Sequence, residues 1–106
     1  MNHVRLSIAM LLAMTTTSAI AADIDPDDLK FFEAKIRPVL VEHCYKCHSA
    51  AALTANDLQS QLLLDTREGI RKGGESGPAV VPGDVKASAL IAAIRHETFE
   101  MPPKSK

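Results

Sequence analysis

The stretch HCYKCH, residues 43–48, holds the side chains of this sequence best suited to chemistry. Two cysteines stand three positions apart and a histidine follows the second, which is the attachment signature of c-type haem. Two thiols at this spacing can add across the two vinyl groups of haem as thioethers, and the next histidine can give a ring nitrogen to iron. The pattern predicts that Cys44 and Cys47 carry haem c and that His48 is the proximal iron ligand.

Three other sites could use the same residues. A zinc site built from His43, Cys44, Cys47 and His48 would take four ligands from six residues, whereas structural zinc sites use two separated pairs. A thioredoxin-like dithiol needs a preceding strand in a βαβ unit, and the sequence shows no convincing strand. A disulfide between the two cysteines is the third alternative.

The iron of a haem held here needs a second axial ligand. Met101 is the only methionine beyond the N-terminal segment, and two prolines follow it directly. Paired histidine and methionine ligands are typical of electron-transfer cytochromes with a raised potential. We expect Met101 to be the distal ligand, with His96 or an open sixth position as the alternatives. A carbonyl of the Gly77-Pro78 turn is a candidate acceptor for the second ring nitrogen of His48.

The first 21 residues have the features of a secretory signal. Arg5 supplies a positive start, Leu6 to Met14 form an apolar run too short to span a membrane, and Ala19 and Ala21 offer small residues to a signal peptidase. We expect cleavage after Ala21, which leaves residues 22–106 as one small domain outside the cytoplasm, in the periplasm or an equivalent space. Exported cysteines rarely remain free, so an export signal favours haem attachment at Cys44 and Cys47.

Composition limits the possible functions further. The chain has 106 residues, a formal net charge of −1, three Phe, one Tyr and no Trp. No basic stripe is present, so nucleic acid is not an expected partner, and no membrane is required after signal cleavage. A domain this small and poor in aromatic residues needs an additional stabilising element. A covalent haem would be one, because its apolar faces join the core.

The hydrophobic pattern predicts a small all-α domain. A helix capped by Asp25 should run into the CYKCH segment, with a kink near residues 34–38 because Pro38 lies inside it. Residues 49–60 should form a loop with one helical turn. Asp65 and Glu68 resemble a capping box that opens a helix ending near Lys72, and Ser88 should cap a last helix to about residue 97. Arg67, Arg71, Lys72 and Arg95 are candidate partners for the haem propionates.

Taken together, these segments resemble the planctomycete-type cytochrome c domain of the class I cytochrome c superfamily. The resemblance rests on FFEAKIRPVLVEHCYKCHS, LLLDTREGIRKGGESGPAVVPGD, SALIAAI and MPPK, and covers about residues 31–104. It implies that Cys44 and Cys47 carry haem, that His48 is the proximal ligand and that Met101 is the distal one. Members of this family continue past MPPK into a C-terminal helix that crosses the first helix, so we expect this chain to form the fold without it.

These expectations describe an exported c-type cytochrome that transfers single electrons to redox partner proteins and is not an enzyme. A second hypothesis is a haem-bearing interaction or redox-sensing module that a partner protein completes and that serves a larger exported enzyme. A third, a peroxidase or ligand sensor with an open iron position, requires that Met101 does not bind the iron.

Overall fold

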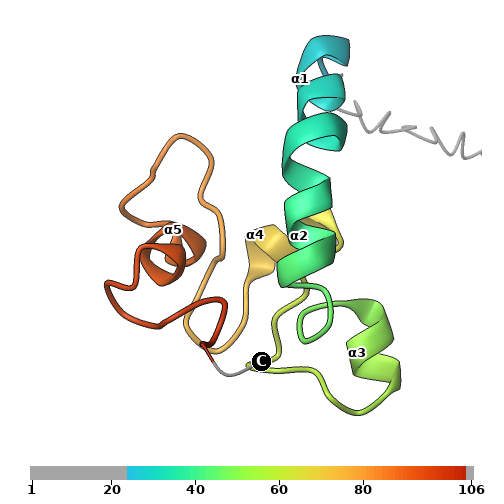
Figure 1. Cartoon of the computed structure of the whole chain (residues 1–106). Helices are drawn as coiled ribbons and strands as arrows, with labels where there is room; N and C mark the ends of the chain where they lie inside the picture. The colour runs from blue at the N-terminus through green and yellow to red at the C-terminus, as the bar shows by residue number, and fades with distance from the viewer. Residues whose placement is uncertain (1–23, 105–106) are drawn as a thin grey trace, which may run out of the picture.

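A computed structural model describes residues 24–104, which form short helices joined by loops (Figure 1). No β-strand forms within this range, and the backbone pairs only in two isolated bridges, Gly74 with Gly77 and Val81 with Asp84. The helical elements are α1 (Pro26–Phe31), η1 (Phe32–Ile36), α2 (Arg37–His43), α3 (Ala50–Thr54), α4 (Arg67–Lys72) and α5 (Ala89–Ile94). The all-α class is therefore confirmed for these residues, whereas the predicted signal peptide, residues 1–21, lies outside them.

One continuous helical rod, α1–η1–α2, leads into the C-x-x-C-H segment (Figure 1). It begins as predicted: the Asp25 carboxylate accepts the backbone N–H of Asp27 at 2.8 Å, and Pro26 stands at the first helical position. The irregularity predicted around Pro38 takes the form of a π-helical turn, in which the Arg37 N–H bonds to the carbonyl of Phe32. Proline has no N–H to give to the carbonyl four residues before it, so a wider turn adjoins it.

Helix α4 begins one residue later than the predicted capping box. Thr66, not Asp65, is the N-cap: its hydroxyl accepts the N–H of Gly69 at 2.9 Å. Asp65 instead accepts the N–H of Ala50, at the start of α3, at 2.8 Å. Both residues can cap a helix, and the fold gives each a different one. The predicted end of α4 at Lys72 is confirmed, with Gly73 following at a φ of 72°.

Helices α3 and α5 are short. The single turn predicted between residues 49 and 60 is α3, whose N-cap Ser49 accepts the N–H of Ala52 at 3.2 Å. Helix α5 ends at Ile94, earlier than predicted. Ser88 occupies its N-cap position, but its buried hydroxyl accepts the N–H of Val81 at 2.9 Å and donates to the carbonyl of Asp84 at 2.7 Å. Ser88 therefore closes the loop before α5 and does not cap the helix.

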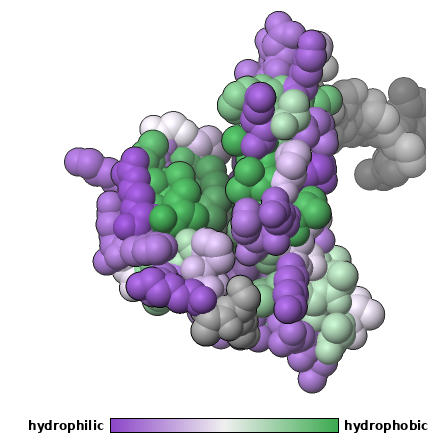
Figure 2. Space-filling view, viewed as in Figure 1, coloured by the Kyte–Doolittle hydropathy of each residue, from purple (hydrophilic) through white to green (hydrophobic). Residues whose placement is uncertain are grey.

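The described part of the chain has a small hydrophobic core. Three of the five buried hydrophobic residues in the described part of the chain are alanines, the others being Leu40 and Leu64. Large side chains such as Phe31, Val39, Ile94 and Phe99 remain at least half exposed. Figure 2 shows hydrophobic residues gathered where the lobe around α5 faces the long helix. Much of the apolar surface therefore faces the space between α5 and the long helix and is not packed into a core.

None of the helices between residues 24 and 104 has the length and apolar character needed to cross a bilayer.

Candidate haem site

A cavity of about 250 Å³ lies where the end of α2, the loops at residues 59–64 and 74–79, helix α5 and the terminal segment meet. All four residues predicted from the sequence line it: Cys44, Cys47, His48 and Met101. Most of the remaining wall is apolar, with contributions from Leu62, Leu64, Ala79, Leu90, Ala93, Ile94 and Phe99. The fold therefore brings the segment 43–48 and the segment 99–103 to one largely apolar chamber.

The two cysteines are held by a turn at the end of α2. The N–H groups of Cys47 and His48 both bond to the carbonyl of Cys44, at 3.1 and 3.0 Å. Both thiols are free and partly buried, so the disulfide alternative is not formed here. Burial raises the pKa of the Cys44 thiol, whereas an attacking cysteine of a redox dithiol has a lowered pKa. The surroundings of Cys44 therefore do not support dithiol chemistry.

The zinc alternative requires that His43, Cys44, Cys47 and His48 converge on one point. Across residues 24–104, no three side chains of the types His, Cys, Asp and Glu come together as a group that could hold a metal ion. His43 does line the cavity, but its side chain is half exposed and its Nε2 lies 3.7 Å from Glu42 Oε2. The four side chains therefore do not form a tetrahedral site in this arrangement.

His48 is buried in the cavity wall, with 8% of its surface exposed. Its Nδ1 is buried and has no hydrogen-bond partner, so the predicted bond to a carbonyl of the Gly77-Pro78 turn is not formed. The carbonyl of Pro78 accepts the N–H of Ala89 instead, at 3.2 Å. Since Nδ1 is enclosed by protein, Nε2 is the nitrogen left to serve a ligand in the chamber.

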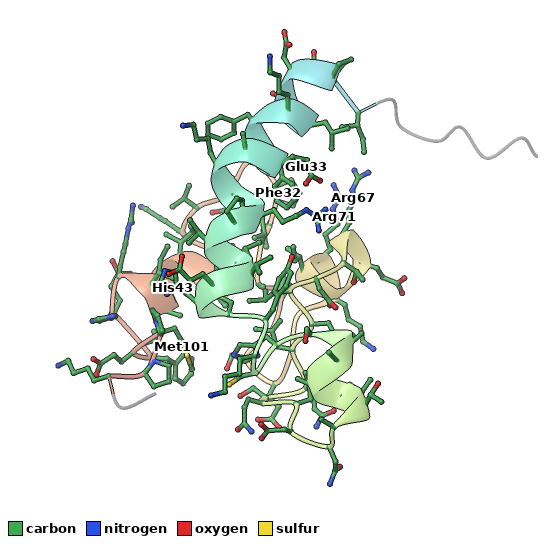
Figure 3. All side chains as sticks on the ribbon, turned by 45° about the vertical axis from the view of Figure 1, so that its right-hand side comes forward. Phe32, Glu33, His43, Arg67, Arg71 and Met101 are labelled. Carbon is green, nitrogen blue, oxygen red and sulfur yellow. The ribbon has the colours of Figure 1, made fainter. Side chains whose placement is uncertain are left out.

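Met101 reaches the cavity from the segment that follows α5. Figure 3 shows Met101 on the same side of the long helix as α5. Its N–H bonds to the carbonyl of Ala93 at 3.3 Å, which ties the segment to the end of α5. The peptide bond between Met101 and Pro102 is cis. His96, the alternative distal ligand, is exposed and does not line the cavity. Of the two residues, only Met101 is placed to face a group bound there.

No lysine or arginine lines the cavity within the described part of the chain. The four basic residues proposed as propionate partners, Arg67, Arg71, Lys72 and Arg95, therefore lie elsewhere. In Figure 3, Arg67 and Arg71 extend from α4 toward the part of the long helix that carries Glu33. Glu33 is itself bonded to Arg37 at 2.7 and 2.8 Å. Polar groups on the wall come instead from residues such as Gln59, Ser60, Glu75 and Ser76.

Sequence reasoning missed the segment that supports the histidine. The carbonyls of Cys47 and His48 accept the N–H groups of Gln59 and Leu64, at 3.0 and 2.9 Å. Asp65, next in the chain, binds the N–H of Ala50. The only signal in the sequence was that Asp65 and Thr66 are both capping residues, of which α4 can use one as its N-cap.

The residues present fit a haem. A partly apolar chamber suits a flat, largely apolar ring, two thiols stand on its wall, and a histidine with one enclosed nitrogen adjoins them. Thiolates, thioethers and imidazoles are the side chains that hold haem iron in proteins. The donors therefore agree in type with the group that the C-x-x-C-H spacing predicts.

Comparison with known proteins gives one match. A sequence model of the family described as planctomycete cytochrome C matches residues 44–105, more than half of the chain and from the first cysteine onward. No curated protein and no solved structure matches significantly. The matched range contains both cysteines, the histidine that follows them and Met101.

Proposed function

The chain belongs to the planctomycete cytochrome c family, and from that premise we propose that it is an exported c-type cytochrome domain that transfers single electrons. Family membership implies a haem-binding electron carrier. The covalent attachment, the ligand set and the export are the parts that we propose. The observation that carries the proposal is the shared cavity: Cys44, Cys47, His48 and Met101 all line it.

Each of these residues has a distinct role in the proposal. The thiols of Cys44 and Cys47 would hold the haem as two thioethers. His48 would hold the iron through Nε2, since the wall encloses Nδ1, and Met101 would offer its sulfur from the segment after α5. When bound, haem supplies an iron that alternates between ferric and ferrous states.

The apolar wall would exclude water from a bound haem and so disfavour the more charged ferric state. A methionine ligand raises the potential in the same direction. The chain itself does not move protons or transform a substrate in this proposal, so its partners are other redox proteins and it is not an enzyme.

The test is attachment of haem in cells with a c-type maturation system. We expect the exported protein to keep its haem after denaturation, with a mass equal to that of the processed chain plus one haem. Replacing both cysteines, Cys44→Ser with Cys47→Ser, should abolish that retention. Haem retained by the double variant, or absent from the wild-type protein despite export, would refute covalent attachment.

A second candidate is a haem-bearing interaction or redox-sensing module that a partner completes. It is favoured by the apolar side chains that the long helix leaves exposed: Leu29, Phe31, Ile36, Val39 and Val41 are 39–60% exposed. The two candidates differ in what the isolated chain can do. A monomer that keeps both axial ligands without any partner supports the electron carrier. A monomer that loses the methionine ligand until a partner is added supports the module.

A further inference from the structure

The segment that carries the proximal histidine is tied to one neighbouring segment at three successive places. Backbone N–H groups of Gln59 and Leu64 bond to the carbonyls of Cys47 and His48, at 3.0 and 2.9 Å. The third bond runs the other way: the N–H of Ala50 donates to Asp65 Oδ2 at 2.8 Å. The first two bonds are formed by the backbone. Asp65 therefore provides the one side chain among the three links.

This link lies at the edge of a buried region: Ala50 is exposed and Asp65 is partly buried, whereas their neighbours are enclosed. His48, Ser49 and Leu64 are 8%, 5% and 2% exposed, and the second oxygen of Asp65, Oδ1, is buried without a hydrogen-bond partner. The bond itself is exposed, so water can satisfy the Ala50 N–H when the carboxylate is lost, and the cost should be that of an ordinary capping bond. Removing the carboxylate would free the Ala50 end of the segment, two residues after the histidine.

We infer that Asp65 is a positioning residue for His48: its carboxylate fixes the backbone on the C-terminal side of the histidine and so orients the imidazole toward the iron. Ser49, the next residue, also restrains this backbone. Its hydroxyl donates to the carbonyl of Tyr45 at 2.6 Å and accepts the N–H of Ala52. His48 has no hydrogen bond at Nδ1 to hold its ring. Its orientation therefore depends on the backbone that Asp65 holds. This inference rests on the proposed haem function.

The test compares three variants of the matured, exported protein. Asp65→Ala removes the acceptor, and Asp65→Asn keeps an oxygen that can accept from Ala50. Asp84→Ala is the control, because Asp84 Oδ1 also accepts an exposed backbone N–H, that of Ala87 at 3.0 Å, but this bond joins residues three apart and is remote in sequence from the histidine. Amide hydrogen exchange is measured at Ala50 and Leu64, and axial ligation is followed in the visible and near-infrared absorption of the oxidised form.

In Asp65→Ala we expect exchange at Ala50 and Leu64 to be roughly five- to tenfold faster, the range that loss of a capping bond of typical strength gives. The ligand absorption bands should shift or weaken in the same variant. Asp65→Asn should keep both signals near wild type, and Asp84→Ala should change neither.

An unchanged Leu64 exchange rate in Asp65→Ala, or equal effects in Asp65→Ala and Asp84→Ala, would overturn the inference. Failure of the proposed function is a separate observation: the wild-type protein would carry no covalent haem. In that case exchange at Leu64 would still decide whether Asp65 holds the backbone of His48.

Discussion

At the scale of single residues, the account depends on four side chains that two distant segments contribute to one cavity. Three of them fall within five consecutive residues, so their spacing alone predicts their joint role. Met101 was predicted by elimination, as the one methionine beyond the N-terminal segment, and the fold places it in the same chamber. The predicted hydrogen bond from His48 to the Gly77-Pro78 turn was wrong, because whether a carbonyl meets Nδ1 depends on how the 74–79 loop packs.

Replacing Met101 tests the distal ligand. In Met101→Ala the oxidised protein should lose the weak far-red band that sulfur ligation gives, and the reduced protein should bind carbon monoxide. The reduction potential should fall because methionine ligation raises it. His96→Ala, in a residue outside the cavity, is the control and should leave all three properties unchanged. A far-red band that persists in Met101→Ala would show that another residue is the ligand.

At the scale of the elements, the sequence predicts most helices, but it misplaces the start of α4 and the end of α5. The rod that leads into the haem segment was predicted from its apolar spacing and from Asp25 and Pro26, which act locally. The start of α4 was wrong by one residue because Asp65 is used by α3, and no local pattern reports a bond across that distance. Ser88 was also predicted as an N-cap from its residue type and position, but its hydroxyl accepts the N–H of Val81 in the loop before α5.

The turn after α4 offers a sharp test of cavity geometry. A Cβ at Gly73 would lie 1.8 Å from the carbonyl oxygen of Gly77, at a φ of 72°. Gly83 has a φ of 78° but nothing within 4 Å of its Cβ position. Gly83→Ala should therefore cost about 1–2 kcal/mol of unfolding free energy, from backbone strain alone. Gly73→Ala should cost clearly more and reduce haem retention, as measured by denaturant unfolding and haem absorbance. Equal costs would contradict this packing.

The ion pair on the long helix predicts a pH effect. The side-chain hydrogen bond from Arg37, followed by the attraction of its charge, lowers the pKa of Glu33 from its ordinary value of 4.5. Because the folded-state pKa is the lower one, the pair stabilises the helix above pH 4.5, and this contribution is lost as the pH falls through the lowered pKa. Both side chains are largely exposed, so the effect on stability should be small.

NMR titration of the Glu33 carboxyl measures this shift directly. We expect the Glu33 pKa to lie below 4.5 in the wild-type protein and to return toward it in Arg37→Gln. Titrating Glu33 in Arg71→Gln provides the control, because no ion pair joins Arg71 to Glu33 in this structure. An equal rise in both variants would show that the general field of the arginines, and not the specific bond, sets the pKa.

At the scale of the whole molecule, the notable property is how little of the chain is buried. Only five hydrophobic residues of the described part are buried and most of those are alanine, whereas larger side chains line the cavity. Because the sequence contains few aromatic residues, it predicted a core that needs an additional stabilising element. The shape of the chamber, and the absence of basic residues from its described wall, depend on long-range packing that composition does not encode.

Stability should therefore depend on the haem. We expect the Cys44→Ser, Cys47→Ser double variant to lose most of its cooperative thermal transition, because a ring that fills the chamber buries apolar surface worth roughly 25 cal/mol per Å². Circular dichroism and calorimetry would follow the transition. The Cys44→Ser single variant, which keeps one thioether, is the intermediate control. A double variant that melts as cooperatively as the wild-type protein would show that the chain forms a sufficient core alone.

The most direct test of the central claim is an equilibrium redox titration of the matured protein, followed by its visible spectrum, once under argon and once under carbon monoxide. The account predicts a single reversible one-electron transition with the same midpoint under both gases, because His48 and Met101 occupy both axial positions. A midpoint raised by carbon monoxide would show an open iron position and favour a sensor or peroxidase. A spectrum with no reversible transition would contradict the electron carrier altogether.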